Sequence, residues 1–138
     1  MKAKEKIRKI SDSLKEAGVA DADREAETIV MRISGIGREL LYIDDPDLEA
    51  NVSEGVDNAL ARRALGEPLQ YILGSLEFYG LTINVGKGVL IPRPETELMV
   101  DEVIKYVRST KKAHAKVLIL DLCTGSGCIA LALAANIR

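Results

Sequence analysis

The chain has 138 residues, of which 47% are hydrophobic and 29% charged, with 19 Lys and Arg against 21 Asp and Glu. This balance is typical of a soluble globular chain, and no apolar run approaches the roughly 18 residues that a membrane span needs. A near-neutral chain with no Trp and one Phe also differs from proteins that bind nucleic acid through phosphates or base stacking.

Residues 2–73 have the apolar spacing of helices. Ile7, Ile10 and Leu14 recur at steps of three and four residues, which predicts a first helix that ends near Gly18. Four further helices are expected. One is capped by Asp21, one spans 38–43, one ends at about residue 65, and one runs from 68 to 73. Because none of them would be stable alone in water, we expect residues 1–74 to form an all-α bundle.

The apolar period changes to two after Gly74. Apolar residues at alternate positions on either side of Tyr79 and Gly80 predict a β-hairpin, and Val89–Ile91 predicts a further short strand. We therefore interpret residues 75–92 as a hairpin linker between two larger parts of the chain.

Residues 93–138 have the order helix, strand, glycine-rich loop and helix. Pro94 predicts the start of an amphipathic helix, and Val117–Leu120 is typical of a strand buried in a parallel sheet. The loop 121–127 then leads into a buried helix at 128–135. This order predicts the beginning of a Rossmann-like α/β domain, so the whole chain is expected to be α+β.

One strand cannot form a parallel sheet. The run 117–120 would therefore have unpaired edges, and the helix after it an uncovered apolar face. We expect the residues after about Lys112 either to be disordered or to pair with another copy of the chain.

The glycine-rich loop fits two kinds of cofactor. Gly125-x-Gly127-x-x-Ala130 matches the fingerprint of an NAD-binding dehydrogenase. Asp121, at the mouth of the predicted strand, would repel a pyrophosphate but would suit a ligand with sulfonium and ammonium groups, such as S-adenosylmethionine. The loop alone favours a methyltransferase over a dehydrogenase, and a purely structural turn is a third interpretation.

Two cysteines, Cys123 and Cys128, flank the loop, and His114 is the only histidine. A disulfide framework or a zinc site would need more such residues, so we expect two reduced thiols and no metal site. The N-terminal residues lack the apolar core of a signal peptide. These features predict a cytoplasmic protein.

Four segments occur in the order of the signatures of one enzyme family: GEPLQYILG at 66–74, EFYG at 77–80, LIPRPETE at 90–97 and DLCTGSG at 121–127. Through these segments the chain resembles the HemK family, closely over residues 66–138 and only in helical pattern over 1–65. Members of that family are S-adenosylmethionine-dependent methyltransferases that modify the glutamine of the Gly-Gly-Gln motif in peptide chain release factors.

The resemblance implies a role for each part of the chain. Residues 1–74 would recognise the release factor, and residues 93–138 would begin the domain that binds S-adenosylmethionine. The family's Asn-Pro-Pro-Tyr motif, which grips the acceptor glutamine, has no counterpart in the 138 residues. We therefore expect no catalytic residue here and an incomplete, inactive part of the enzyme; the alternative is a non-catalytic protein-binding module.

The resemblance also implies which residues hold the cofactor: the carboxylate near its positive end, the loop backbone beside its methionine part, and two residues at the edge of the site. These residues are Asp121, Cys123, Thr124, Gly125, Ser126, Gly127, Arg93 and Glu95. Cys123 stands where the family commonly has glycine. For the two edge residues, a solvated arginine and a helix-capping glutamate are the structural alternative.

Overall fold

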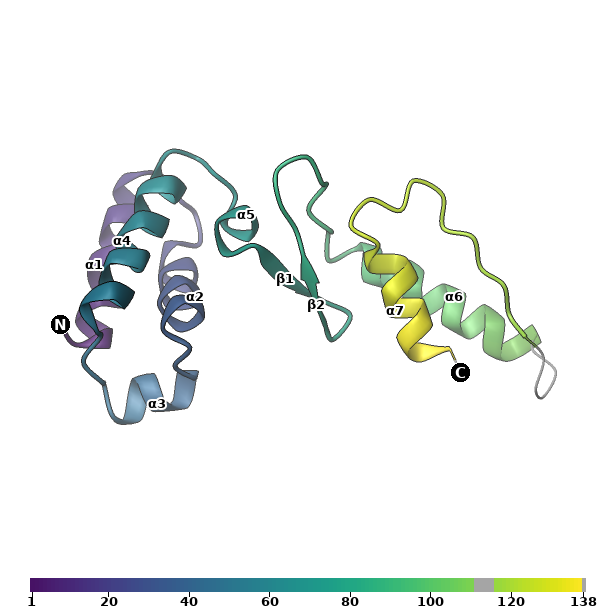
Figure 1. Ribbon diagram of the computed structural model, residues 1–138, viewed down its shortest axis with the longest axis horizontal. Coiled ribbons are helices and arrows are strands. Elements are labelled where there is room, and N and C mark those ends of the chain that lie inside the picture. Colours follow the sequence, from purple (N-terminus) through teal and green to yellow (C-terminus); the bar gives the residue numbers. More distant parts are fainter. Residues whose placement is uncertain (111–115, 138) are drawn as a thin grey trace. The chain divides into compact units, whose positions relative to one another are not determined.

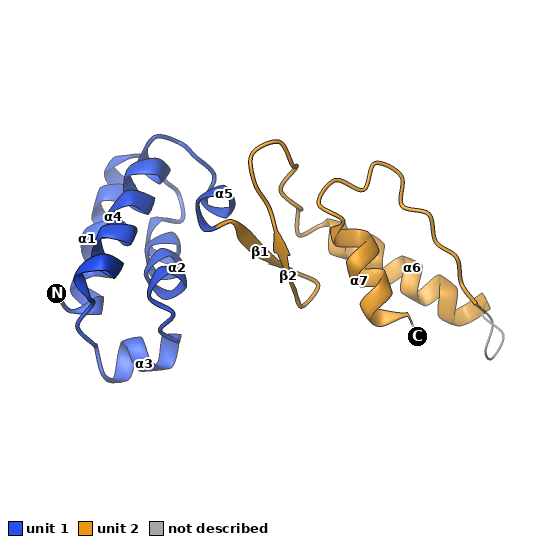
Figure 2. Cartoon of the chain, viewed as in Figure 1, with its two compact units in different colours: residues 1–73 blue, residues 74–138 orange. Residues whose placement is uncertain are grey.

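The computed structural model describes residues 1–110 and 116–137. The chain divides into two compact units, residues 1–73 and residues 74–138 (Figures 1 and 2). The regular elements of the first unit are helices, with one isolated β-bridge between Lys2 and Asp47, and the described part of the second unit contains one two-stranded antiparallel hairpin and two helices.

The first unit contains five helices, as the sequence predicted. They are α1 (Ala3–Glu16), α2 (Ala22–Ser34), α3 (Arg38–Ile43), α4 (Ala50–Ala64) and α5 (Leu69–Leu73). Gly35 ends α2 in a left-handed conformation with φ 70°, and its N–H donates to the carbonyl of Met31 at 2.9 Å. A residue with a Cβ would be strained in this conformation, which is why glycine suits the end of the helix.

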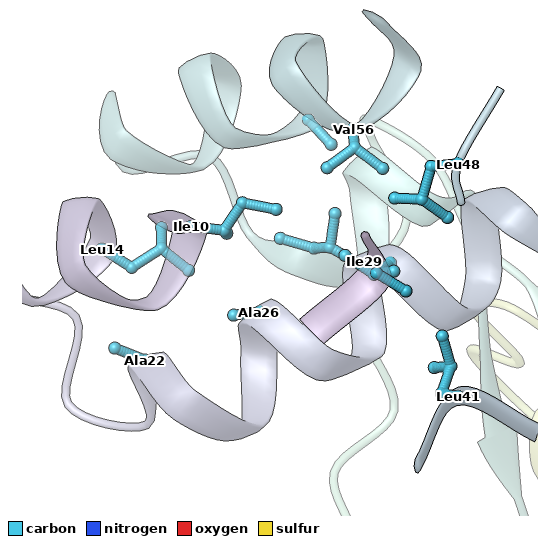
Figure 3. Close-up of a cluster of buried hydrophobic side chains, with 11 residues drawn as sticks. Ile10, Leu14, Ala22, Ala26, Ile29, Leu41, Leu48 and Val56 are labelled. Carbon is cyan, nitrogen blue, oxygen red and sulfur yellow. The ribbon is translucent and has the colours of Figure 1, made fainter. Parts of the chain in front are cut away.

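The apolar faces of α1, α2 and α4 meet in one core (Figure 3). Ile10, Leu14, Ile29 and Val56 are at most 1% exposed. Full burial of each such side chain contributes about 1.5–3 kcal/mol. The helical bundle is therefore held chiefly by the residues whose spacing indicated the helices.

A buried lysine links α1 to α4. Lys6 is 4% exposed, and its Nζ donates to Ser53 Oγ at 2.8 Å and to both carboxylate oxygens of Asp57 at 2.7 Å. A buried ammonium group is tolerated only when such partners replace its hydration. The contact ties together two helices that are about fifty residues apart in the sequence.

The second unit begins with the predicted β-hairpin. Strands β1 (Ser75–Phe78) and β2 (Leu81–Asn84) pair antiparallel, with Leu76 opposite Ile83 and Phe78 opposite Leu81. Both turn residues have positive φ, 50° for Tyr79 and 73° for Gly80, as a two-residue hairpin turn of type I′ requires.

Helices α6 (Thr96–Thr110) and α7 (Cys128–Asn136) lie against each other (Figure 1). Their buried residues are Val100, Ile104 and Val107 on α6, and Cys128, Ala132 and Leu133 on α7. The expectation that the helix after the glycine loop would have an uncovered apolar face is therefore wrong for these α7 positions, whereas Leu131 on the same helix is 51% exposed, as expected.

The two further strands expected from the sequence are absent. Residues 89–91 are irregular, and so are residues 117–120, where Leu118 is 99% and Leu120 80% exposed. A strand forms only by pairing its backbone with another strand, and β1 with β2 makes the one sheet within residues 1–110 and 116–137. The Rossmann-like beginning is not confirmed and remains a prediction.

Two smaller expectations also differ from the structure. Helix α6 begins at Thr96, because Pro94 and Glu95 form the turn before it. The expected disorder from about Lys112 falls partly on residues 111–115, which lie outside the described residues. Residues 116–127 are described and run without regular structure to α7; pairing with another copy stays a prediction.

None of the described helices has both the length and the apolar character needed to cross a membrane. In the same residues, no three His, Cys, Asp or Glu side chains gather as metal ligands.

Candidate cofactor loop

The loop 121–127 leads into α7 through a series of left-handed residues. Cys123 has φ 60°, Gly125 57° and Gly127 77°. For a residue with a Cβ this conformation costs roughly 1–2 kcal/mol. Cys123 therefore occupies a strained position, which explains in physical terms why glycine suits that position in the resembled family.

Internal hydrogen bonds fix the loop and its carboxylate. Thr124 Oγ1 donates to Asp121 Oδ2 at 2.9 Å, and the Gly127 N–H donates to the Thr124 carbonyl at 2.9 Å. Within the described residues, Asp121 Oδ1 accepts no hydrogen bond, and the N–H groups of Gly125 and Ser126 donate none. The loop thus offers a carboxylate oxygen and backbone donors to a ligand, at the positive end of the α7 dipole.

A small hollow lies beside Asp121. Its volume is about 220 Å³, and Asp121 is the charged residue in a lining that is otherwise apolar. These are Val117, Ile119, Ala130, Leu133, Ala134 and Ile137. Small-molecule sites usually measure roughly 300–1,000 Å³, so this hollow has room for part of a cofactor.

Arg93 and Glu95 lie just before α6 and are exposed. Their carbonyls accept hydrogen bonds from the N–H groups of Thr96, at 3.0 Å, and Leu98, at 3.2 Å. Within the described residues, neither side chain forms an ion pair or a hydrogen bond, so Glu95 does not cap the helix. No hydrogen bond or ion pair joins these two side chains to loop 121–127 within the described residues, although α6 and α7 begin at the same end of the pair (Figure 1).

The sequence interpretation missed a pair of hydrogen bonds at the tip of the hairpin. The Tyr79 N–H donates to Glu97 Oε1 at 2.7 Å, and its hydroxyl donates to Asp101 Oδ1 at 2.6 Å. Two carboxylates four residues apart share one face of a helix. The four-residue spacing of these carboxylates, together with a tyrosine at the tip of the hairpin, is the sequence signal from which the two hydrogen bonds could have been predicted.

A family model described as the PrmC N-terminal domain matches residues 5–74. The chain belongs to this family. The matched residues cover nearly all of the helical unit, from α1 through α5, and end at the start of the hairpin.

Curated relatives extend the similarity of this PrmC-family chain over both units. Proteins named release factor glutamine methyltransferase are 42% identical over 136 residues in Thermodesulfovibrio yellowstonii, 42% over 133 in Geobacter sulfurreducens and 37% over 130 in Haemophilus influenzae. These matches cover 99%, 93% and 93% of this chain, and 46%, 45% and 44% of the relatives. The chain thus spans less than half the length of these relatives, and the family recognised from its motifs is confirmed.

Proposed function

We propose that this chain is part of an S-adenosylmethionine-dependent methyltransferase that modifies the glutamine side-chain amide in the Gly-Gly-Gln motif of peptide chain release factors. The observation that carries the proposal is the 42% identity, over 136 residues and both units, to a protein named release factor glutamine methyltransferase. In this proposal residues 1–74 recognise the release factor, residues 75–92 link the two parts, and residues 93–138 begin the cofactor domain.

The chemistry of the loop supports S-adenosylmethionine as the ligand. Asp121 offers a carboxylate to a cationic group, and the N–H groups of Gly125 and Ser126 offer donors to a carboxylate. A ligand with both charges fits this set, whereas a pyrophosphate would be repelled by Asp121. When bound, S-adenosylmethionine supplies a methyl group activated by a positively charged sulfur.

Thr124 holds Asp121 in place through its hydroxyl, so the carboxylate is oriented before a ligand arrives. Cys123 and the backbone through Gly127 line the methionine side of the proposed site, with Arg93 and Glu95 at its edge. An amide nitrogen is a weak nucleophile that must be oriented by hydrogen bonds. Because the 138 residues contain no Asn-Pro-Pro-Tyr motif, we propose that they transfer no methyl group by themselves.

The cofactor is tested by titrating the chain with S-adenosylmethionine and with NAD⁺ in a calorimeter. We expect heat from S-adenosylmethionine, and a weakening of its binding by about tenfold in Asp121→Asn, since one charged contact is lost. Asp12→Asn, at an exposed carboxylate in the other unit, is the matched control and should bind as well as the original chain. Tighter binding of NAD⁺, or an unchanged affinity in Asp121→Asn, would contradict the proposal.

Methyl transfer is tested separately with a purified release factor and S-adenosylmethionine labelled in its methyl group. We expect no label in the release factor when the 138-residue chain is the only enzyme. Stoichiometric labelling would refute the proposed inactivity while supporting the substrate. Both cysteines are free thiols, which is consistent with the cytoplasmic location that we propose.

A further inference from the structure

The helical unit has a large groove on its surface. The groove measures about 820 Å³ and is lined by residues of α1, α2 and α3. Ile7 and Met31 are partly buried against the core, and Tyr42 is 49% exposed. The apolar part of the lining therefore consists of side chains that a partner could cover.

Most of the charges in the groove already have partners. Lys15 Nζ donates to Asp23 Oδ1 at 2.6 Å, and the hydroxyl of Ser11 donates to the same oxygen. These hydrogen bonds hold the pKa of Asp23 below its usual value, and the one from Lys15 has the larger effect. Arg38 lies with Nε 2.7 Å from Glu27 Oε1, and its Nη2 donates to Oε2 at 3.2 Å.

Two guanidinium groups remain. Arg8 on α1 and Arg24 on α2 are exposed, and within the described residues neither side chain has an ion pair or a hydrogen bond. Asp12 is the acidic residue of the lining that likewise has no ion pair or hydrogen bond from its side chain within the described residues. After internal pairing, the groove therefore has two positive charges against one negative charge.

This local charge is opposite to that of the bundle. Residues 1–74 contain 11 Lys and Arg against 15 Asp and Glu, a net charge of −4. A partner attracted by the general charge of the bundle would be basic. An acidic segment would instead be repelled from most of the surface and find complementary charge in the groove, which is a basis for specificity.

We propose that the groove between α1, α2 and α3 binds an acidic segment of the release factor, an inference that rests on the proposed function. Arginine is suited to this role because its planar guanidinium can bind a carboxylate through two hydrogen bonds. Carboxylates of the segment pair with Arg8 and Arg24, and an apolar side chain between them covers Ile7, Met31 and Tyr42.

The test is the affinity of the chain for a purified release factor at low and high salt. We expect the double variant Arg8→Ala/Arg24→Ala to bind about tenfold more weakly at low salt, and to show less salt dependence, because two ion pairs are lost. Asp12→Asn should bind more tightly, since it removes the unpaired acid. Arg108→Ala, at an exposed arginine on α6, is the matched control and should leave the affinity unchanged.

Circular dichroism should show the same melting curve for all variants, because Arg8 and Arg24 are exposed and have no partner to lose within the described residues. Should the double variant nevertheless unfold, two other variants test the groove. Arg8→Lys/Arg24→Lys keeps the positive charges, and Asp12→Asn should raise the affinity for the release factor where the loss of the arginines lowers it. Equal binding of the release factor by the original chain, the double variant and Asp12→Asn would overturn the proposed role of the groove while leaving the proposed function in place.

Two other outcomes also overturn the inference. If the release factor does not bind the chain at all, the proposed recognition by residues 1–74 fails together with the groove. If the arginine variants lose affinity for a DNA duplex instead of the release factor, the partner of the groove is a nucleic acid and the protein partner is wrong.

Discussion

Tyr79 joins two elements of the second unit. Its backbone N–H and its hydroxyl are both bound by carboxylates on successive turns of α6, and its φ of 50° lies in the left-handed region. The hydrogen bond to Asp101, then burial and the charge of Asp101, raise the pKa of Tyr79 above its usual value. The tip of the hairpin is therefore attached to the helix through a group that can be titrated.

The sign of the pH effect follows from the donor. The protonated hydroxyl makes the hydrogen bond, so the pKa is higher in the folded than in the unfolded state. The contribution of Tyr79 to stability is complete below about pH 10, the pKa in the unfolded state, and is lost as the pH rises through the folded-state pKa.

Absorbance at 295 nm measures this titration. We expect Tyr79→Phe to remove a tyrosine component that titrates above the usual pKa of tyrosine. Tyr106→Phe, at a tyrosine of α6 that is 68% exposed, is the control and should leave this high-pH component in place. A high-pH component that persisted in Tyr79→Phe would show that it does not come from Tyr79.

Lys6 shows a limit of sequence patterns at the same scale. It lies three residues after Ala3 and four before Ile10, on the apolar side of α1. Helical periodicity indicates burial at this position, whereas the residue type indicates exposure. Its partners Ser53 and Asp57 are in α4, and no spacing along the chain points to them.

Replacing Lys6 tests that contact. We expect Lys6→Ala to lower the free energy of unfolding by about 1–3 kcal/mol, because the buried stem and its charge-assisted hydrogen bonds are lost. Urea denaturation followed by circular dichroism at 222 nm measures the change. Lys4→Ala removes an exposed lysine from the same helix and should change stability by less than about 0.5 kcal/mol. Equal effects of the two substitutions would show that the buried contact does not stabilise the bundle.

At the scale of elements, the sequence predicted best where an element forms by local rules. The five helices of the first unit and the hairpin after Gly74 follow apolar period, helix-ending glycines and turn residues, although the Asp21 side chain makes no capping hydrogen bond at the start of α2. The segment 117–120 has the same clear apolar pattern but is irregular. Its pattern indicates a strand only if other strands lie on its edges, and strand formation depends on those neighbours more than on the residues themselves.

Hydrogen exchange tests this difference between elements. We expect the amides of residues 117–120 to exchange rapidly, because no backbone partner protects them within the described residues. The amides in the middle of α2, whose Ile29 and Val30 are fully buried, should exchange far more slowly. Slow exchange at 117–120 that becomes slower as the protein concentration rises would instead indicate pairing with another copy of the chain.

For the whole molecule, one boundary between the parts of the chain was visible in the sequence, whereas the assembled site was not. The change of apolar period after Gly74 lies where the two compact units divide. For the candidate site, the sequence singled out Asp121 and the glycine loop. It could not show that Thr124 orients Asp121, or that the side chains of Arg93 and Glu95 make no polar contact with described residues. Such contacts depend on three-dimensional placement that no local pattern encodes.

The two thiols of the chain differ in accessibility, since Cys123 is exposed in the loop and Cys128 is buried at the start of α7. A maleimide dye added to the folded chain would therefore attach at one position, inside the candidate cofactor loop, without any engineered cysteine. The chain thus contains its own point of attachment for a fluorescent reporter, at the place where a bound ligand would change the dye's surroundings.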